Sequence, residues 1–421
     1  MLSKLQLDVC KRVQGLEDEL IEVLSGLIAT NTADPPGDNY DVCAELLSDY
    51  LEKLGAQVKI EEIAPEFLPR SPETGKMLSR PNVVAKLVFS ENGPDLQFNG
   101  HYDVVPAVGE WTSDPYRPEV RGGKLYGRGT NDMKGGIVAS MVAAKALKLG
   151  NANLKGTLSF SFVPDEENDR EAGTKFLTEQ KKVQPDYCIV AEATGTKDLC
   201  NGHMGSLWLE IVTRGKPAHG SSPWRGINAF DKMVEVVEAI DSKIKPSLLH
   251  RGDNKVDPST ARKIGAITLG GIVTTGDSPN VVPPQCTMTI DRRLAPGESV
   301  NRALGEFTSV FESLKKSDPQ FRGDYKIISQ YEPCVSPTDS YLVQTVKEAV
   351  ESVTGETCNI SILMGGCDMH YFHAAGIPTL VYGPGAVGMA HQADEYVEVK
   401  ALITAAQVYA LTALSLLGAQ S

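Results

Sequence analysis

The stretch GHYDVVP at residues 100–106 directly follows DLQFN at 95–99, an apolar-alternating run that predicts a short β-strand. Side chains two residues apart on an extended segment point the same way, so His101 and Asp103 are expected to emerge together at the strand end. An imidazole that binds a metal needs its second nitrogen oriented by an acceptor, and a nearby carboxylate can fill that role. The stretch therefore predicts one corner of a metal site, although a lone His-x-Asp is usually incidental.

Size and composition limit the function classes. The chain has 421 residues, which suggests two or three domains, and 41% hydrophobic with 23% charged residues is typical of a globular protein. The net charge of −13 argues against a nucleic-acid partner, because phosphate binding uses clustered Lys and Arg. Residues 1–24 predict an amphipathic helix rather than a signal peptide, and no segment is expected to reach the length of a membrane span.

The cysteines indicate the compartment and the metal chemistry. Eight cysteines are scattered along the chain without a CxxC pair, which favours reduced thiols in a cytoplasmic protein. A metal site would then have to use imidazoles and carboxylates. The chain has only seven His, so the candidates are few.

Acidic turns follow several predicted strands of the first half. The strands predicted at 95–99, 156–164 and 186–193 lead to His101, to Asp165 with Glu166 and Glu167, and to Glu192, respectively. In open α/β sheets, sites form at the carboxyl ends of the strands. Asp132 stands between a Gly-rich loop and a helix predicted at 137–150, where capping that helix is the simpler interpretation.

A different order of elements begins near residue 204. The patterns predict strand, helix, strand, strand, helix and strand at 206–215, 228–244, 261–272, 285–294, 298–316 and 325–332. This is the order of a ferredoxin-like module. We therefore predict an α/β fold class, with a phosphorylase/hydrolase-like catalytic domain whose central mixed sheet is flanked by helices. That domain comprises 1–203 and 334–421, and an inserted α+β domain comprises 204–333.

The candidate metal ligands are His101, Asp132, Glu167, Glu192 and His391. Five ligands are more than one tetrahedral zinc ion can bind, but they fit two ions about 3.5–4 Å apart that share a carboxylate. Imidazole and oxygen donors favour Zn²⁺, with Mn²⁺ or Co²⁺ able to substitute. Asp132 is the expected bridge, and Glu166 is the expected general base that takes a proton from the attacking water.

Five motifs occur in a fixed order: GHYDVVP, GRGTNDMKGG, PDEEN, AEAT and GMAHQADE. Together they resemble the zinc-dependent amidohydrolase family of acetylornithine deacetylase, succinyl-diaminopimelate desuccinylase, aminoacylase and the glutamate-releasing carboxypeptidase. The resemblance spans nearly the whole chain and implies that the inserted domain is a lid and dimerisation domain. It implies two Zn²⁺ per subunit, one held by His101, Asp132 and Glu192, the other by Asp132, Glu167 and His391. Asp103 would orient His101, and Glu166 would be the general base.

The resemblance also implies roles for residues of the insert and of a later loop. GKPAHGSSPWRGINA at 215–229 is similar to a family segment whose His reaches the other subunit's active site, which maps to His219 as an oxyanion donor. Asn280 and Arg292 match substrate-contacting positions, and MGGCDMHYF at 364–372 resembles a loop beside the site. Within that loop the matching residues are Gly365 and Gly366, and Cys367 stands where relatives often carry Thr or Ser.

Simpler interpretations exist for several of these residues. Glu166 and Glu167 could be solvated turn acids, and His219 could cap a turn. Adjacent strand residues face opposite ways, so only one of Arg292 and Arg293 can face substrate. The remaining histidines near the motifs are expected to have structural, hinge, packing or substrate-lining roles: His203, His370 and His373.

The predicted activity is hydrolysis of the amide bond of an N-acyl amino acid by a homodimeric metalloenzyme. Glu192 favours deacylation, because peptidase branches of the family tend to have Asp at that position. A metallo-dipeptidase or carboxypeptidase acting on a dipeptide-like substrate is the first alternative. A catalytically dead binding protein on the same scaffold is the alternative from another class. No membrane partner is expected.

Overall fold

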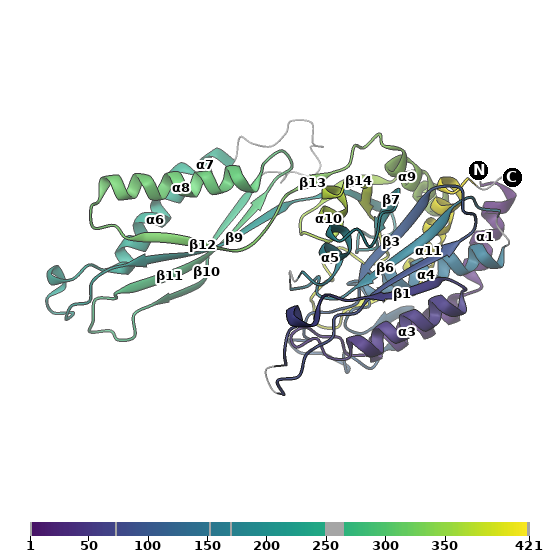
Figure 1. Cartoon of the computed structure of the whole chain (residues 1–421), viewed down its shortest axis with the longest axis horizontal. Helices are drawn as coiled ribbons and strands as arrows, with labels where there is room; N and C mark the ends of the chain where they lie inside the picture. Colours follow the sequence, from purple (N-terminus) through teal and green to yellow (C-terminus); the bar gives the residue numbers. More distant parts are fainter. Residues whose placement is uncertain (1, 72–73, 151–152, 169–170, 249–264, 419–421) are drawn as a thin grey trace. The chain divides into compact units, whose positions relative to one another are not determined.

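The computed structural model describes residues 2–71, 74–150, 153–168, 171–248 and 265–418 (Figure 1). The chain divides into two compact units. Unit 1 comprises Met1–Gly202, Ser336–Ile362 and Cys367–Ser421, and unit 2 comprises His203–Val335 with Leu363–Gly366.

Unit 1 is built on a mixed sheet with the strand order β1-β2-β6-β3-β7-β15-β8, and β14 also pairs with β8. These strands are β1 (Gln57–Glu61), β2 (Asn82–Val88), β3 (Asp95–His101), β6 (Thr157–Val163), β7 (Tyr187–Val190), β8 (Asp198–His203), β14 (Asn359–Leu363) and β15 (Thr379–Val381). Strand β3 is parallel to β6 and β7, and β15 is parallel to β7. Almost every side chain of β3 and β6 is buried, as expected for strands covered on both faces.

Helices flank this sheet. They are α1 (Lys4–Gln14), α2 (Glu17–Ala29), α3 (Tyr40–Lys53), α4 (Lys134–Leu149), α5 (Thr174–Glu179), α9 (Tyr341–Thr354), α10 (Met369–Ala374) and α11 (Val399–Leu416), with a short 3-10 turn η1 (Pro65–Phe67). Helix α4 packs on β3, and α3 packs on β1 and β2. Gly136 lets the first turn of α4 approach the end of β7, because a Cβ there would lie 2.0 Å from the carbonyl oxygen of Ala191.

Unit 2 is an antiparallel sheet with the order β10-β11-β9-β12. Its elements are β9 (Gly205–Arg214), η2 (Pro223–Arg225), α6 (Ala229–Lys243), α7 (Lys245–Leu248), β10 (Ala266–Thr275), β11 (Gln285–Leu294), α8 (Val300–Ser317), β12 (Gly323–Tyr331) and β13 (Cys334–Val335). Residues of α6 and α8 share a buried apolar core with β9 and β11. The predicted ferredoxin-like order is confirmed, although residues 261–264 of the strand predicted at 261–272 lie outside the described part of the chain.

The structure differs from the sequence expectations in the N-terminal helix and in the connection at 111–130. The N-terminal segment forms two helices rather than one, because α1 ends at the C-cap Gly15 and α2 begins at Glu17. The connection at 111–130 contains β4 (Glu119–Arg121) and β5 (Lys124–Tyr126). Strand β5 pairs with β4 on one side and with β16 (Tyr396–Glu398) on the other. Their period-2 pattern is too short to be read from the sequence. The resulting three-stranded sheet brings residues near 126 and 396 together.

Helix α11 also corrects the membrane expectation. It is long and apolar enough to cross a membrane, although the sequence interpretation found no such segment. Most of it is buried against α4, α9 and α1, as in the core helix of a globular domain.

Candidate active site

Three neighbouring parallel strands bring the candidate residues to one edge of the unit 1 sheet. His101 is the last residue of β3 and pairs in register with Val163, the last residue of β6. The turn after β6 carries Glu166 and Glu167, and Glu192 follows β7. The structure therefore confirms that strand, turn and acid recur at the carboxyl edge of the sheet.

The ring of His101 is held in one orientation. Its Nδ1 donates a hydrogen bond to the backbone carbonyl oxygen of Asp103 at 3.0 Å, which directs the second ring nitrogen, Nε2, toward the neighbouring carboxylates. That Nε2 lies 3.2 Å from Oδ1 of Asp132 and 3.2 Å from Oε1 of Glu192. The side chain of His101 is 1% exposed, so its Nε2 faces the carboxylates and not solvent.

His391 approaches the same carboxylates from the C-terminal part of unit 1. Its Nε2 lies 3.0 Å from Oε2 of Glu167 and 3.4 Å from Oδ2 of Asp132. The residue has a φ of 65°, in the left-handed region that non-Gly residues rarely adopt. The two oxygens of Asp132 thus face different imidazoles, which is the arrangement expected of a carboxylate shared by two cations.

The donor set fits divalent cations by chemistry and by spacing. Donor atoms of His101, Glu166 and Glu192 lie within 4.8 Å of one another, as do those of His101, Asp132 and Glu167. Imidazole nitrogen and carboxylate oxygen are the donors that Zn²⁺, Mn²⁺ and Co²⁺ take when no thiolate is present.

The electrostatics of the cluster also fit cations. Burial raises the pKa of Glu166 well above its usual range, and burial together with the nearby Asp132 raises the pKa of Glu167 to about 7. The carboxylates Asp132 and Glu167 raise the pKa of His391 to about 10. The cluster thus contains several carboxylates and little positive charge to balance them, and bound divalent cations would supply that charge.

Asp103 holds the turn after β6 in place. Its carboxylate accepts hydrogen bonds from the backbone N–H groups of Glu166 at 3.3 Å and of Glu167 at 3.0 Å. The carboxylate itself lies 3.5 Å from Nδ1 of His101, farther than the backbone carbonyl of the same residue. Asp103 therefore orients His101 mainly through its main chain, and its side chain orients the two glutamates.

A profile of the peptidase family M20/M25/M40 matches residues 97–415, which contain this whole cluster. The chain belongs to this family. It is a metal-dependent amide hydrolase.

Similar proteins include two deacylases and one dipeptidase by name. A Staphylococcus aureus protein named probable succinyl-diaminopimelate desuccinylase is 28% identical, over 91% of this chain and 93% of that protein. The acetylornithine deacetylase of Aliivibrio fischeri is 32% identical, over 83% of this chain and 85% of that protein. The crystal structure of human carnosine dipeptidase 1 shares the fold, with a TM-score of 0.76 and 19% identity over 98% of this chain and 99% of that one.

The M20 chain has further buried acids near the cluster that the sequence interpretation did not assign. Glu395 accepts three backbone N–H groups of the loop that carries Asp132. Asp368 accepts a hydrogen bond from Thr174 Oγ1 at 2.6 Å, and burial raises the pKa of Asp368 to about 7. Both residues fall inside quoted motifs, but a motif does not say which of its acids faces the metals.

Two other predicted site residues lie in unit 2 of this M20 chain. His219 and Asn280 are exposed and adjacent, because residue 219 bridges to Val281 and the N–H of Gly220 donates to the carbonyl oxygen of Asn280 at 2.7 Å. Nδ1 of His219 lies 2.8 Å from Oγ of Ser221. The structure therefore brings together two residues that were expected to contact substrate.

The burial of Arg292 argues against the substrate-binding role expected for it. Its side chain is fully buried and pairs with Glu298 inside unit 2. Arg293, on the opposite side of β11, is partly exposed, pairs with Asp291 and donates to Tyr331 Oη at 3.3 Å. A Cβ on Gly366 would lie 2.4 Å from that same hydroxyl, so Gly366 and Arg293 converge on Tyr331, whereas nothing lies within 4 Å of a Cβ on Gly365.

The remaining histidines have main-chain partners where contacts are described. Nδ1 of His203 donates to the carbonyl oxygen of Met204 at 2.8 Å, and its ring packs edge-on against Tyr331. Nδ1 of His370 donates to the carbonyl oxygen of the buried Cys367 at 2.8 Å, and burial lowers the pKa of His370 to about 4. His373 is exposed. These contacts agree with structural rather than ligand roles.

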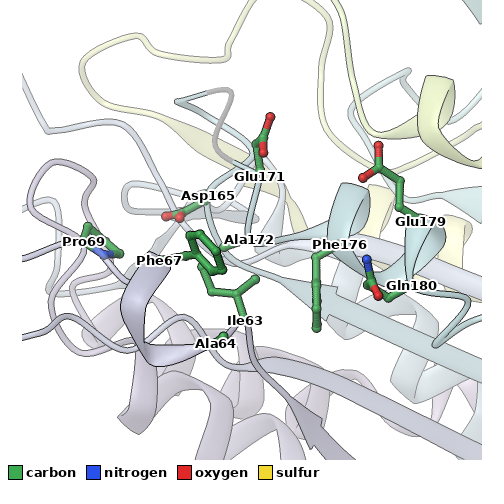
Figure 2. Close-up of a pocket in the computed structure, with 10 residues that line it drawn as sticks. All are labelled: Ile63, Ala64, Phe67, Pro69, Asp165, Glu171, Ala172, Phe176, Glu179 and Gln180. Carbon is green, nitrogen blue, oxygen red and sulfur yellow. The ribbon is translucent and has the colours of Figure 1, made fainter.

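A pocket of about 720 Å³ lies beside the turn that follows β6 (Figure 2). Its lining is largely apolar, with the rings of Phe67 and Phe176 among the labelled side chains. Asp165 lines it too, and that carboxylate is held by Arg80 at 2.7 Å. None of the candidate metal ligands lines this pocket.

Proposed function

We propose that this chain is a dinuclear zinc enzyme that hydrolyses the amide bond of an N-acyl amino acid. The carboxylate of Asp132 between the imidazoles of His101 and His391 is the observation that carries the proposal. His101, Asp132 and Glu192 would hold one ion, and Asp132, Glu167 and His391 would hold the other. Co²⁺ or Mn²⁺ could replace Zn²⁺ in such a donor set.

The metals, when bound, would acidify the attacking water and polarise the scissile carbonyl. Glu166 would move the protons. It lies 3.9 Å from Nε2 of His101, farther than Asp132 or Glu192, so it is the acid of the cluster with the least contact to an imidazole ligand. The water oxygen attacks the carbonyl carbon, and Glu166 accepts the released proton. When the C–N bond breaks, Glu166 delivers that proton to the leaving nitrogen.

The substrate class rests on two observations. Glu192 stands where the resemblance favours deacylases, and the desuccinylase and the deacetylase are similar over most of their lengths. A dipeptidase is the second candidate, since the fold is shared with a dipeptidase. The eight cysteines are thiols rather than halves of disulfides, which supports a cytoplasmic location.

A screen with zinc-loaded protein tests the reaction class. N-acetyl, N-succinyl and N-formyl amino acids and a panel of dipeptides would be followed by liquid chromatography, with Glu166→Gln as the control for contaminating hydrolases. We expect kcat/KM for an N-acyl amino acid to exceed that for any dipeptide by at least about tenfold. Faster cleavage of dipeptides would support the peptidase, and no cleavage of any amide by metal-loaded protein would support a binding protein.

His219 is proposed to donate a hydrogen bond to the developing oxyanion in the other subunit of a homodimer, with Asn280 nearby. The side chain of His219 is exposed in unit 2, and this supports the role, because a residue that acts on another subunit must be accessible at the surface of its own. His219→Ala is expected to lower kcat by about 10²–10³-fold without loss of zinc.

Mixing two inactive variants tests the crossing between subunits. A heterodimer of His219→Ala with Glu166→Gln would contain one site with both residues intact. After subunit exchange we expect up to about a quarter of wild-type activity to return, since half of the dimers are mixed and each has one restored site. If mixing restores nothing, while each variant remains dimeric and binds zinc, His219 does not act across the dimer.

A further inference from the structure

Glu395 joins the two loops that carry the metal ligands Asp132 and His391. Its Oε1 accepts backbone N–H groups of Gly129 at 3.0 Å, Asn131 at 2.8 Å and Asp132 at 3.1 Å. Its Oε2 pairs with Arg128 at 2.5 Å. Glu395 is fully buried and Arg128 is 1% exposed, so this carboxylate bonds to the loop rather than to water.

The same loops are tied together on either side of Glu395. The N–H of Gly127 donates to the carbonyl oxygen of Glu395 at 2.9 Å, and Tyr126 pairs with Tyr396 between β5 and β16. On the other side, the N–H of Ala386 donates to Oδ1 of Asn131 at 2.7 Å. His391 therefore lies in a segment attached to the Asp132 loop at both ends.

We propose that Glu395 and Arg128 form a clamp that sets the spacing between Asp132 and His391. Both are positioning residues, because they act through the main chain of the Asp132 loop and would touch neither metal nor substrate. The inference rests on the proposed two-metal site. It predicts that the ion held by Asp132, Glu167 and His391 depends on the clamp more than the ion held by His101, Asp132 and Glu192, since only the former takes two ligands from the clamped loops.

The chemistry of the pair suits this task. A carboxylate that accepts several N–H groups from successive residues fixes the path of a loop more tightly than one hydrogen bond could. Arg128 balances the charge of Glu395, so the clamp adds no net negative charge beside Asp132. In Glu395→Gln one oxygen becomes an NH₂ group, which cannot accept from the loop or pair with Arg128.

The test measures binding of each metal ion separately. Metal-free wild type, Glu395→Gln and Arg128→Lys would be titrated with Zn²⁺ against a chromophoric chelator, and with Co²⁺ while the visible spectrum is recorded. Glu298→Gln is the matched control, because Glu298 is a buried carboxylate that also accepts a backbone N–H and pairs with an arginine, but in unit 2. Arg128→Lys keeps the charge and leaves Glu395 intact, so it remains informative if Glu395→Gln fails to fold.

In Glu395→Gln we expect the ion held by Asp132, Glu167 and His391 to lose about 10–100-fold in affinity, with its Co²⁺ bands changed, while the ion held by His101, Asp132 and Glu192 keeps its affinity. Arg128→Lys should lie between that variant and wild type, and Glu298→Gln should bind both ions as wild type does. The inference is overturned if folded Glu395→Gln binds both ions with wild-type affinity. If Glu395→Gln does not fold, wild-type affinity for both ions in Arg128→Lys overturns it instead. So does an equal loss of both ions. If wild type itself binds no metal, the proposed function fails first.

Discussion

The carboxylate of Asp103 accepts a hydrogen bond from the backbone N–H of Glu167 at 3.0 Å. Asp103 follows β3 and Glu167 follows β6, so this bond joins the ends of two neighbouring parallel strands. The same residue holds the ring of His101 through its main-chain carbonyl. One short segment thus sets the relative positions of two proposed ligands, a histidine and a carboxylate, and of the proposed general base.

Asp103→Asn is expected to lower kcat by about 10–100-fold. The amide has only one acceptor oxygen, so at least one of the N–H groups of Glu166 and Glu167 loses its partner. Because the main chain still holds His101, zinc content should change little. Steady-state kinetics and metal analysis of the purified variant would check both statements. Full activity in the variant would show that the side chain does not position the glutamates.

Glu166 and Glu167 are adjacent but are expected to respond differently to the same substitution. Glu166→Gln should retain both metal ions and lose turnover by at least about 10²-fold, because it removes only the proton acceptor. Glu167→Gln should lose one ion, since Glu167 contacts His391 directly at 3.0 Å. Each variant serves as the steric control for the other. Equal loss of metal in both would contradict the separate roles.

Metal removal should make stability depend on pH in a defined direction. In the metal-free cluster the pKa of Glu167 rises from its ordinary 4.5 to about 7, so the stability it contributes at low pH is lost as pH rises through 7. The pKa of His391 rises to about 10, and its contribution is likewise lost as pH rises toward that value. The Tm gained on adding zinc should therefore grow between about pH 5 and about pH 8. Thermal unfolding with and without a chelator would measure it, and a constant or shrinking gain would contradict the prediction.

Gly136→Ala should destabilise unit 1 and disturb the metal centre. The new Cβ would lie 2.0 Å from the carbonyl oxygen of Ala191, the residue before the proposed ligand Glu192. We expect a loss of about 1–3 kcal/mol in the free energy of unfolding and weaker zinc binding.

Gly26→Ala is the matched control for this change. Gly26 lies within α2, and nothing lies within 4 Å of a Cβ built there. That variant should be as stable as wild type or more stable by up to about 1 kcal/mol, because Ala has the higher helix propensity. Equal effects of the two substitutions would show that helix propensity, not the contact with Ala191, controls the outcome.

Local sequence patterns predicted most of the long strands and helices of the fold. The strand predicted at 285–294 coincides with β11, and the order of the long strands and helices of unit 2 matches the prediction, because alternation and helical periodicity are strong in long elements. The short elements η2, α7 and β13 were not predicted. The short strands β4, β5 and β16 were missed, since three residues hold no measurable period. The break at Gly15 was missed because apolar residues continue at helical spacing on both sides of it.

The sequence by itself determined the family and the kinds of donor atom, because both are properties of residue types in a fixed order. Only the tertiary structure decided which groups meet. It shows that the side chain of Asp103 accepts hydrogen bonds from the turn that carries the two glutamates, and that Arg292 is buried while Arg293 is accessible. It also shows that Glu395 ties the loop of Asp132 to that of His391. Glu395 and Asp132 lie 263 residues apart in the chain, and their contact depends on the packing of whole loops. Local sequence patterns hold no information about such a contact.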